Sequence, residues 1–177
     1  MLGKSGADST AVYYQTPKTG PLTNKQDWGL QELIKEFNLT LDPCAPIGTK
    51  IDPSLSCCKN FYTEEDDGLV QEWKENSFIN PIYTPASINP ENNIELWIRR
   101  AIIMSQKYGT TNVMLLPAYT GADWWHDYIL PYGVIRYIRG RVKCWQDGKP
   151  SSKTPNIDFV IVIFSSPDPK SYPWSDL

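Results

Sequence analysis

The fold class follows from residues 89–117, which read NPENNIELWIRRAIIMSQKYGTTNVMLLP. Asn89 suits the N-cap of a helix, Pro90 suits its first position, and Gly109 suits its end. Between them the apolar side chains recur at helical spacing; they are Ile94, Trp97, Ile98, Ala101 and Ile102. Residues 113–117 are continuously apolar, as in strands buried on both faces of a sheet. The segment therefore predicts a helix followed by a central strand.

Weaker patterns on either side predict the remaining elements. Helices are expected over residues 25–37, capped by Thr23 or Asn24, and over residues 64–74. The second helix is expected to turn three side chains inward, namely Leu69, Val70 and Trp73. Strands are expected over residues 39–41, ending at Asp42, and over residues 78–79, 134–145 and 157–164. The segment 43–60 predicts a long loop.

Together these elements predict an α/β fold. Its sheet is expected to be mostly parallel, with a C-terminal antiparallel hairpin and helices on both faces. Residues 1–13 are expected to form a mobile tail, and residues 14–177 a single domain.

Composition limits the functions that the chain can have. A net charge of −3 and a pI near 5.2 argue against nonspecific coating of nucleic acid, but they leave room for a local basic face. Arg139, Arg141 and Lys143 alternate along a predicted strand and would share one of its faces. A solvated sheet surface explains this pattern equally well.

The cysteines and the hydropathy indicate the compartment. Cys44, Cys57, Cys58 and Cys144 show neither the spacing of a zinc site nor the density of a disulfide scaffold. We therefore expect a reduced, intracellular protein without a bound metal. No apolar stretch approaches the ~20 residues that span a bilayer, and no apolar signal core is seen, so no membrane association is expected.

Asn80-Pro81-Ile82-Tyr83 follows the predicted strand at residues 78–79 and resembles the catalytic tetrapeptide of amino-group methyltransferases. An amine conjugated to a ring is a poor nucleophile because its lone pair is delocalised. The Asn80 side-chain oxygen and the Pro81 carbonyl oxygen can each accept one amine hydrogen and thereby release the lone pair, while Tyr83 would stack on the base. The alternative is an ordinary turn, since Asn-Pro opens many turns. Ile82 stands where the usual pattern has a second Pro.

The ends of the predicted strands carry polar residues. Ligands of parallel α/β sheets collect at the carboxyl ends of strands. Asp42 and Asn80 each end a predicted strand, so both fall where a site is expected. Asp42-Pro43 is also an ordinary exit from a strand into a turn.

A series of short motifs occurs in a specific order and spacing over about residues 14–164. They are Thr16-Pro17, Leu41-Asp42-Pro43-Cys44-Ala45, Asp67-Gly68-Leu69, Trp73, Asn80-Pro81-Ile82-Tyr83, Val113-Met114-Leu115-Leu116-Pro117, Trp125-His126 and Gly140-Arg141-Val142. This series resembles the phage-type DNA N6-adenine methyltransferases. The resemblance implies a reduced Rossmann-like methyltransferase fold, S-adenosylmethionine as methyl donor, and double-stranded DNA with a flipped adenine as substrate. It also implies an intracellular protein in a host cell, with a virus or prophage as a candidate source.

The resemblance further implies a donor site. Its residues would be Thr16, Pro17, Asp42, Cys44, Ala45 and Asp67. Thr16 and Pro17 would contact the methionine end of the donor, and the carboxylate of Asp42 would attract its ammonium and sulfonium groups. Asp66 or Asp67 would bind the adenosine portion. The alternative for these two acids is the first turn of a helix, which favours negative charge.

The candidate DNA contacts are Trp125, His126, Arg139, Arg141 and Lys143. Trp124 or Trp125 could stack on an exposed base or fill the gap left by a flipped one. One of two adjacent aromatic residues usually belongs to the core, however. His126 is interpreted as structural or DNA-contacting, because a methylated amine is acidic enough to lose its proton to water without a general base.

Two other functions remain open from the sequence. The first is another amino methyltransferase, acting on cytosine N4, RNA adenine or protein glutamine, although Asn80 favours adenine or glutamine. The second is a degenerate methyltransferase fold that serves as a DNA-binding module, an alternative that rests on Ile82. The chain is expected to act as a monomer or a homodimer.

Overall fold

The computed structural model describes residues 29–140, 142, 145–146, 149–150 and 156–165. The expected tail over residues 1–13 and the expected caps at Thr23 and Asn24 lie outside these residues.

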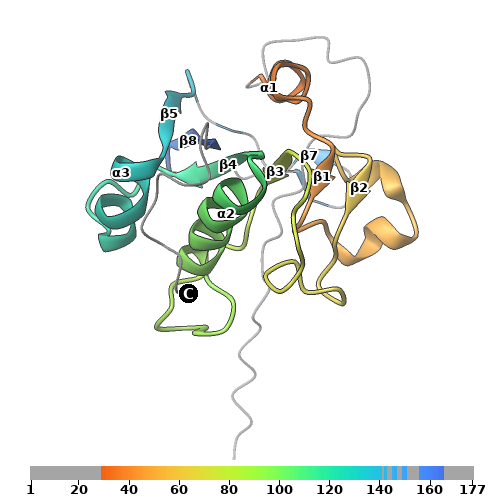
Figure 1. Ribbon diagram of the computed structural model, residues 1–177, viewed down its shortest axis with the longest axis horizontal. Coiled ribbons are helices and arrows are strands. Elements are labelled where there is room, and N and C mark those ends of the chain that lie inside the picture. Colours follow the sequence, from red (N-terminus) through yellow and green to blue (C-terminus); the bar gives the residue numbers. More distant parts are fainter. Residues whose placement is uncertain (1–28, 141, 143–144, 147–148, 151–155, 166–177) are drawn as a thin grey trace, which may run out of the picture.

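A six-stranded sheet runs through the described part of the chain (Figure 1). Its strands, in order across the sheet, are β2 (Asn60–Phe61), β1 (Leu41–Asp42), β3 (Ser77–Ile79), β4 (Thr111–Pro117), β8 (Phe159–Ser165) and β5 (Val134–Tyr137). The first four strands are parallel, whereas β8 is antiparallel to both β4 and β5. The expected mostly parallel sheet with antiparallel C-terminal strands is confirmed. Two short strands, β6 (Trp145–Gln146) and β7 (Lys149–Pro150), pair in a separate sheet.

Helices cover both faces of the sheet. Successive side chains of a strand point to opposite faces, and β4 accordingly divides its side chains between two clusters. Met114 and Leu116 belong to the cluster that contains α2 (Ile94–Tyr108) and the π-helical turn η3 (Trp125–Ile129), which leads into α3 (Leu130–Tyr132). Val113 and Leu115 belong to the cluster on the opposite face, beneath α1 (Leu30–Phe37). The alternation explains why this strand reads as continuously apolar.

The helix α2 ends as predicted but begins later than predicted. Gly109 adopts a φ of 66°, a left-handed conformation that suits a C-cap glycine. At the other end the cap is Asn93, whose Oδ1 accepts the backbone N–H of Leu96 at 3.1 Å. The predicted cap, Asn89, instead accepts the backbone N–H groups of Glu91 at 3.1 Å and Asn92 at 3.0 Å. Any of the asparagines here could cap a helix, so the residue types alone do not choose between them.

The helix predicted over residues 64–74 is wrong; the segment forms successive turns. Asp67 adopts a φ of 51°, which is incompatible with a continuing α-helix. Gly68 then packs so closely on the preceding loop that an added Cβ would lie 1.9 Å from the Pro43 carbonyl oxygen. Trp73 is buried as expected, but Val70 is 66% exposed and therefore does not face the core.

Two further segments differ from the prediction. The strand expected over residues 134–145 is shorter, because β5 ends at Tyr137 and Gly140 has a φ of 90°. Arg139 is therefore not on a strand, and its expected partners Arg141 and Lys143 lie outside the described residues. The loop over residues 43–60 contains two short 3-10 helices, η1 (Ile47–Lys50) and η2 (Pro53–Leu55), and leads into β2, which no pattern predicted.

Candidate active site

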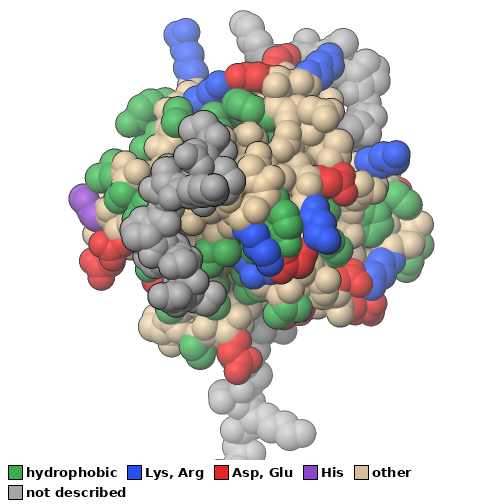
Figure 2. Space-filling model, viewed as in Figure 1, with side chains coloured by type: hydrophobic (Ala, Val, Ile, Leu, Met, Phe, Trp, Pro, Cys, Tyr) green, Lys and Arg blue, Asp and Glu red, His purple; other side chains and the backbone are tan. Residues whose placement is uncertain are grey.

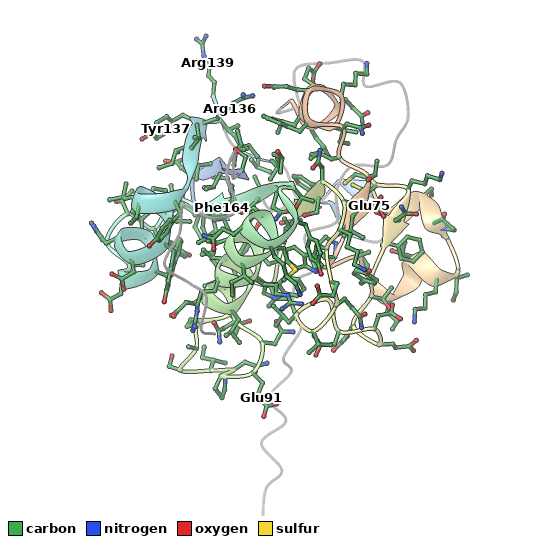
Figure 3. The ribbon with its side chains drawn as sticks, viewed as in Figure 1. Glu75, Glu91, Arg136, Tyr137, Arg139 and Phe164 are labelled. Carbon is green, nitrogen blue, oxygen red and sulfur yellow. The ribbon has the colours of Figure 1, made fainter. Side chains whose placement is uncertain are left out.

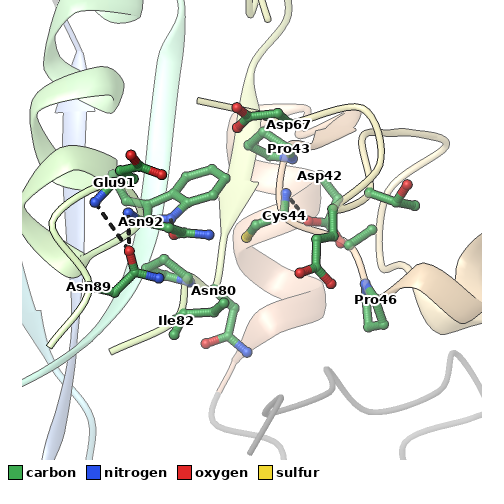
Figure 4. A pocket seen from close by; sticks show the side chains of 16 residues that line it. Asp42, Pro43, Cys44, Pro46, Asp67, Asn80, Ile82, Asn89, Glu91 and Asn92 are labelled. Carbon is green, nitrogen blue, oxygen red and sulfur yellow. Dashed lines mark hydrogen bonds between the residues drawn. The ribbon is translucent and has the colours of Figure 1, made fainter. Parts of the chain in front are cut away.

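A cavity of about 290 Å³ opens at the carboxyl ends of β1 and β3 (Figure 4). Such a volume lies at the lower end of the range for small-molecule sites, about 300–1,000 Å³. Four segments and Trp97 of α2 line the cavity; the segments are the loop that follows β1, the turns at residues 63–68, the tetrapeptide that follows β3, and residues 89–92 before α2. Because β1 and β3 are parallel, their carboxyl ends meet at one edge of the sheet.

Asp42 ends β1 and is only 5% exposed. Its Oδ1 accepts the backbone N–H of Cys44 at 3.2 Å, and its Oδ2 accepts the Ser56 hydroxyl at 3.0 Å. Burial raises the pKa of Asp42 to about 6, because these two hydrogen bonds offset only part of the lost hydration. Asp42 is therefore mostly ionised at neutral pH, as a buried carboxylate that would be stabilised by a cation.

The loop that follows β1 is held in place by the unpredicted strand β2. The Ala45 N–H donates to the Tyr62 carbonyl oxygen at 2.9 Å, and the Tyr62 N–H donates to the Asp42 carbonyl oxygen at 2.9 Å. Burial and the nearby Asp42 charge raise the pKa of the Cys44 thiol, while a hydrogen bond from the Asn80 backbone acts in the opposite direction. Cys44 is therefore a neutral thiol that connects the two strand ends, and not an activated nucleophile.

The cavity has an acidic lining. Its carboxylates are Asp42, Glu64, Asp67 and Glu91. Among the described residues that line it, none is Lys or Arg. Apolar groups from Pro43, Ala45 and Ile82 complete the surface. The cavity therefore favours a positively charged small molecule with an apolar part and disfavours a phosphate.

The tetrapeptide contributes three of its four residues to the cavity. Asn80, Pro81 and Ile82 line it, and Tyr83 does not. The Tyr83 hydroxyl lies 2.5 Å from Asn80 Oδ1 and 2.9 Å from the Leu115 carbonyl oxygen. The Tyr83 ring packs against Phe159 in β8, with ring centroids 5.7 Å apart. In this conformation the ring does not present a face to the cavity.

The other predicted site residues fall into three groups. Cys44, Ala45 and Asp67 line the cavity together with Asp42. Thr16, Pro17, Arg141 and Lys143 lie outside the described residues. The predicted DNA contacts Trp125, His126 and Arg139 are described but do not line the cavity.

The three described DNA-contact candidates differ in their surroundings. Trp125 is 3% exposed and belongs to the core, and its partly buried neighbour Trp124 packs on it at a centroid distance of 5.9 Å. His126 is exposed, and its Nε2 lies 2.8 Å from the Thr120 carbonyl oxygen. Arg139 projects away from the body of the protein beyond the end of β5 (Figure 3).

Several lining residues carried no signal in the sequence. Asn89 and Asn92 belong to a turn before α2, and the Asn92 Oδ1 accepts the indole N–H of Trp97 at 2.8 Å. Trp97 was expected only as a core residue of a helix, yet it also lines the cavity. Ser56 lies within the long loop and reaches Asp42 only through the tertiary fold. No spacing rule connects these positions.

A mostly parallel α/β sheet with an acidic cavity at its strand ends, beside Asn-Pro-x-Tyr, defines an amino-group methyltransferase. The family model of DNA N-6-adenine-methyltransferase (Dam) matches residues 23–171. The chain therefore belongs to this family of adenine-specific DNA methyltransferases, which use S-adenosylmethionine. Neither a curated protein nor a solved structure gives a significant match.

Within the described ranges, no helix is both long and apolar enough to cross a membrane. In the same part of the chain, no group of three or more His, Cys, Asp and Glu side chains is arranged to hold a metal ion.

Proposed function

We propose that the reaction takes place in the cavity between Asp42 and Asn80, on an adenine that has been flipped out of duplex DNA. One observation carries this proposal: a single cavity is lined both by the residues expected to hold the donor and by Asn80 and Pro81. Methyl transfer requires donor and acceptor in one enclosed space, because most of the rate gain comes from positioning and electrostatics.

The residues on the β1 side fit the donor. S-adenosylmethionine supplies a methyl group on a positively charged sulfonium. Asp42 and Asp67 would hold its positive and polar groups, while Cys44 and Ala45 would form the wall next to Asp42. The acidic lining supports this assignment, since a buried carboxylate without a cation is costly.

The residues on the β3 side fit the amine. The Asn80 amide oxygen and the Pro81 carbonyl oxygen would each accept one hydrogen of the N6 amine, which directs the nitrogen lone pair toward the methyl group. The amine nitrogen would gain the methyl group and release one proton to the Asn80 oxygen or to water, while the broken carbon–sulfur bond would leave its electron pair on the donor's sulfur as a neutral thioether. Ile82 supplies an apolar wall, so the missing second Pro would alter the stiffness of the segment and not its acceptors.

DNA would approach from outside this acidic cavity. The face seen in Figure 2 carries Lys and Arg side chains interspersed with Asp and Glu. Exposed His126 and Arg139 remain candidates for contacts with the phosphate backbone, together with Arg141 and Lys143. Trp125 is buried and would act as a support for η3, not as a stacking surface. One copy of the chain supplies both Asp42 and Asn80, so a monomer can form the site.

Labelled S-adenosylmethionine tests the substrate. The protein would be incubated with duplex DNA, RNA and protein acceptors in separate reactions, and the nucleic acids digested to nucleosides. We expect N6-methyladenine from DNA. Methylcytosine, or label found only in RNA or protein, would overturn the proposal.

Asn80→Ala tests the acceptor role. Loss of a preorganised hydrogen-bonding group at a reacting centre costs on the order of a hundredfold in kcat or more, and donor affinity should be mostly retained. Asn60→Ala is the matched control, because Asn60 is exposed on β2 and its side chain donates to Glu75, and neither residue lines the cavity. Full activity of Asn80→Ala would contradict the role given to Asn80.

A further inference from the structure

The Tyr83 hydroxyl makes contacts that base stacking does not require. It lies 2.5 Å from Asn80 Oδ1 and 2.9 Å from the carbonyl oxygen of Leu115. A tyrosine hydroxyl has one hydrogen, and both of these neighbours are acceptors. The shorter contact is to the side-chain oxygen that would accept the target amine.

The hydroxyl is held by the rigid centre of the sheet. Leu115 is in the middle of β4, where it is paired with Ile161 of β8. The Tyr83 ring rests on Phe159, which is in the same strand β8 and is 5% exposed. Tyr83 therefore bridges the tetrapeptide to two central strands.

Asn80 needs such a restraint because the two ends of its carboxamide are chemically opposite. The oxygen accepts hydrogen bonds, whereas the NH2 group only donates them. A half-turn of the carboxamide would place a donor where the substrate's N–H must be received. An oxygen with two lone pairs can accept the Tyr83 hydroxyl on one of them and the target amine on the other.

We infer that Tyr83 is a positioning residue, whose hydroxyl fixes the Asn80 carboxamide with its oxygen at the place required by the N6 amine. The inference rests on the proposed role of Asn80. It assigns a role to the hydroxyl that is distinct from the stacking role expected of the ring, which packs on Phe159 and does not line the cavity in this conformation.

Tyr83→Phe separates these two roles, because it removes the hydroxyl and keeps the ring. We expect a three- to tenfold fall in the single-turnover rate, roughly the effect of one lost hydrogen bond, with unchanged affinity for S-adenosylmethionine. Tyr128→Phe is the matched control, since it removes a partly buried hydroxyl bonded to Glu95 on α2. A Tyr83→Phe rate equal to that of the wild type would overturn the inference.

Placing Tyr83→Phe in a second variant, Asn80→Asp, tests whether the hydroxyl acts through Asn80. In Asn80→Asp both side-chain atoms are acceptors, so the orientation of the group no longer matters. In that background Tyr83→Phe should then lower the single-turnover rate only slightly. A fall in rate as large as in the wild-type background would refute action through the carboxamide. If Asn80→Asp is inactive, the rate and donor affinity of the single variant Tyr83→Phe decide the question.

The outcome is separable from that of the proposed function. An inactive wild type, or an active Asn80→Ala, would contradict the proposed function itself. An active wild type with an inactive Asn80→Ala and a fully active Tyr83→Phe would contradict only the role of the hydroxyl. Thermal unfolding of each variant, compared with Tyr128→Phe, shows whether a lower rate merely reflects loss of folded protein.

Discussion

Asp42 combines a buried position with a proposed role that requires its charge. Its pKa in the folded protein is about 6, against an ordinary value of 3.8. Between these values the folded protein binds more protons than the unfolded chain, so the free energy of unfolding falls as the pH rises. The stability from the protonated carboxyl is present below about pH 4 and is lost as the pH passes 6. The ionised group therefore destabilises the donor-free protein at neutral pH.

Asp42→Asn should raise stability and abolish donor binding. At pH 8 we expect the free energy of unfolding to rise by up to about 3 kcal/mol, which is the free energy that corresponds to the raised pKa of Asp42. The gain should disappear near pH 4, where the wild-type carboxyl is protonated. Urea unfolding at the two pH values measures the gain in the free energy of unfolding, and calorimetric titration measures the affinity for S-adenosylmethionine. A variant that still binds S-adenosylmethionine normally would contradict the proposed anchor.

The pH dependence of donor binding provides a separate test in the wild-type protein. Binding of a cation favours the ionised carboxylate, so affinity should rise as the pH increases through about 6 and then level off. The buried thiols near Asp42 remain neutral over this range, because burial raises the pKa of Cys44, and a hydrogen bond to Cys58 together with burial raises that of Cys57. Titrations between pH 5 and pH 8 measure the effect. A flat profile would show that Asp42 is not the group that meets the donor's charge.

The sequence predicted some site residues but not all of their interactions. The residues at positions 42, 44, 45, 67, 80 and 81 were expected in the site, and the fold brings them to one cavity. The pKa of Asp42 and the bond from the Tyr83 hydroxyl to the Leu115 carbonyl oxygen could not be predicted, since both depend on neighbours distant in sequence. Ser56 is 14 positions from Asp42, and Leu115 is 32 positions from Tyr83.

The turns at residues 63–68 and the loop after β1 form the cavity wall by close backbone contact. Gly68 allows this contact because it has no Cβ; an added Cβ would lie 1.9 Å from the Pro43 carbonyl oxygen. The backbone must move apart to admit a methyl group there. The separation of these two segments therefore determines the shape of the donor side of the cavity.

Gly68→Ala should disturb both stability and donor binding. We expect a loss of about 1–3 kcal/mol in the free energy of unfolding, as for other overpacked sites, together with weaker donor affinity. Gly121→Ala is the matched control, because nothing lies within 4 Å of a Cβ added at Gly121. Unfolding curves and donor titrations of the two variants provide the comparison. Equal behaviour of both would show that the contact with Pro43 is not important.

The prediction of each helix or strand was correct where the local sequence specifies that element, and wrong where contacts distant in sequence specify it. The helix α2 has a long, strongly periodic pattern and the strand β4 has a continuous apolar run, and both were predicted. Residues 64–74 have the composition of a helix start, but contacts with Pro43 and the left-handed Asp67 impose turns. The strand β2 has only two residues, and it pairs with β1 without any pattern of its own.

The net charge of the chain is −3, so we expect its binding to DNA to depend on a local group of positive charges. Arg139→Ala should weaken binding to all DNA sequences about equally. It should also reduce the slope of log K against the logarithm of the salt concentration by about one, the effect of one lost phosphate contact. Arg136→Ala is the matched control, because Arg136 is already paired with Glu36 at 2.6 Å. Binding titrations over a range of salt concentrations measure the slopes. Identical slopes for the wild type and Arg139→Ala would exclude a phosphate contact.

The sequence by itself determined the α/β class, the central helix and strand, and the polar residues placed after strand ends. Those features depend on hydrophobic periodicity and on local chain direction, which short segments encode. Only the tertiary structure decided that residues 63–68 and 89–92 close the cavity, that Trp125 is buried, and that the Tyr83 hydroxyl bonds to Leu115 of β4. These features depend on contacts between segments far apart in the chain, whose geometry is set by packing against the sheet.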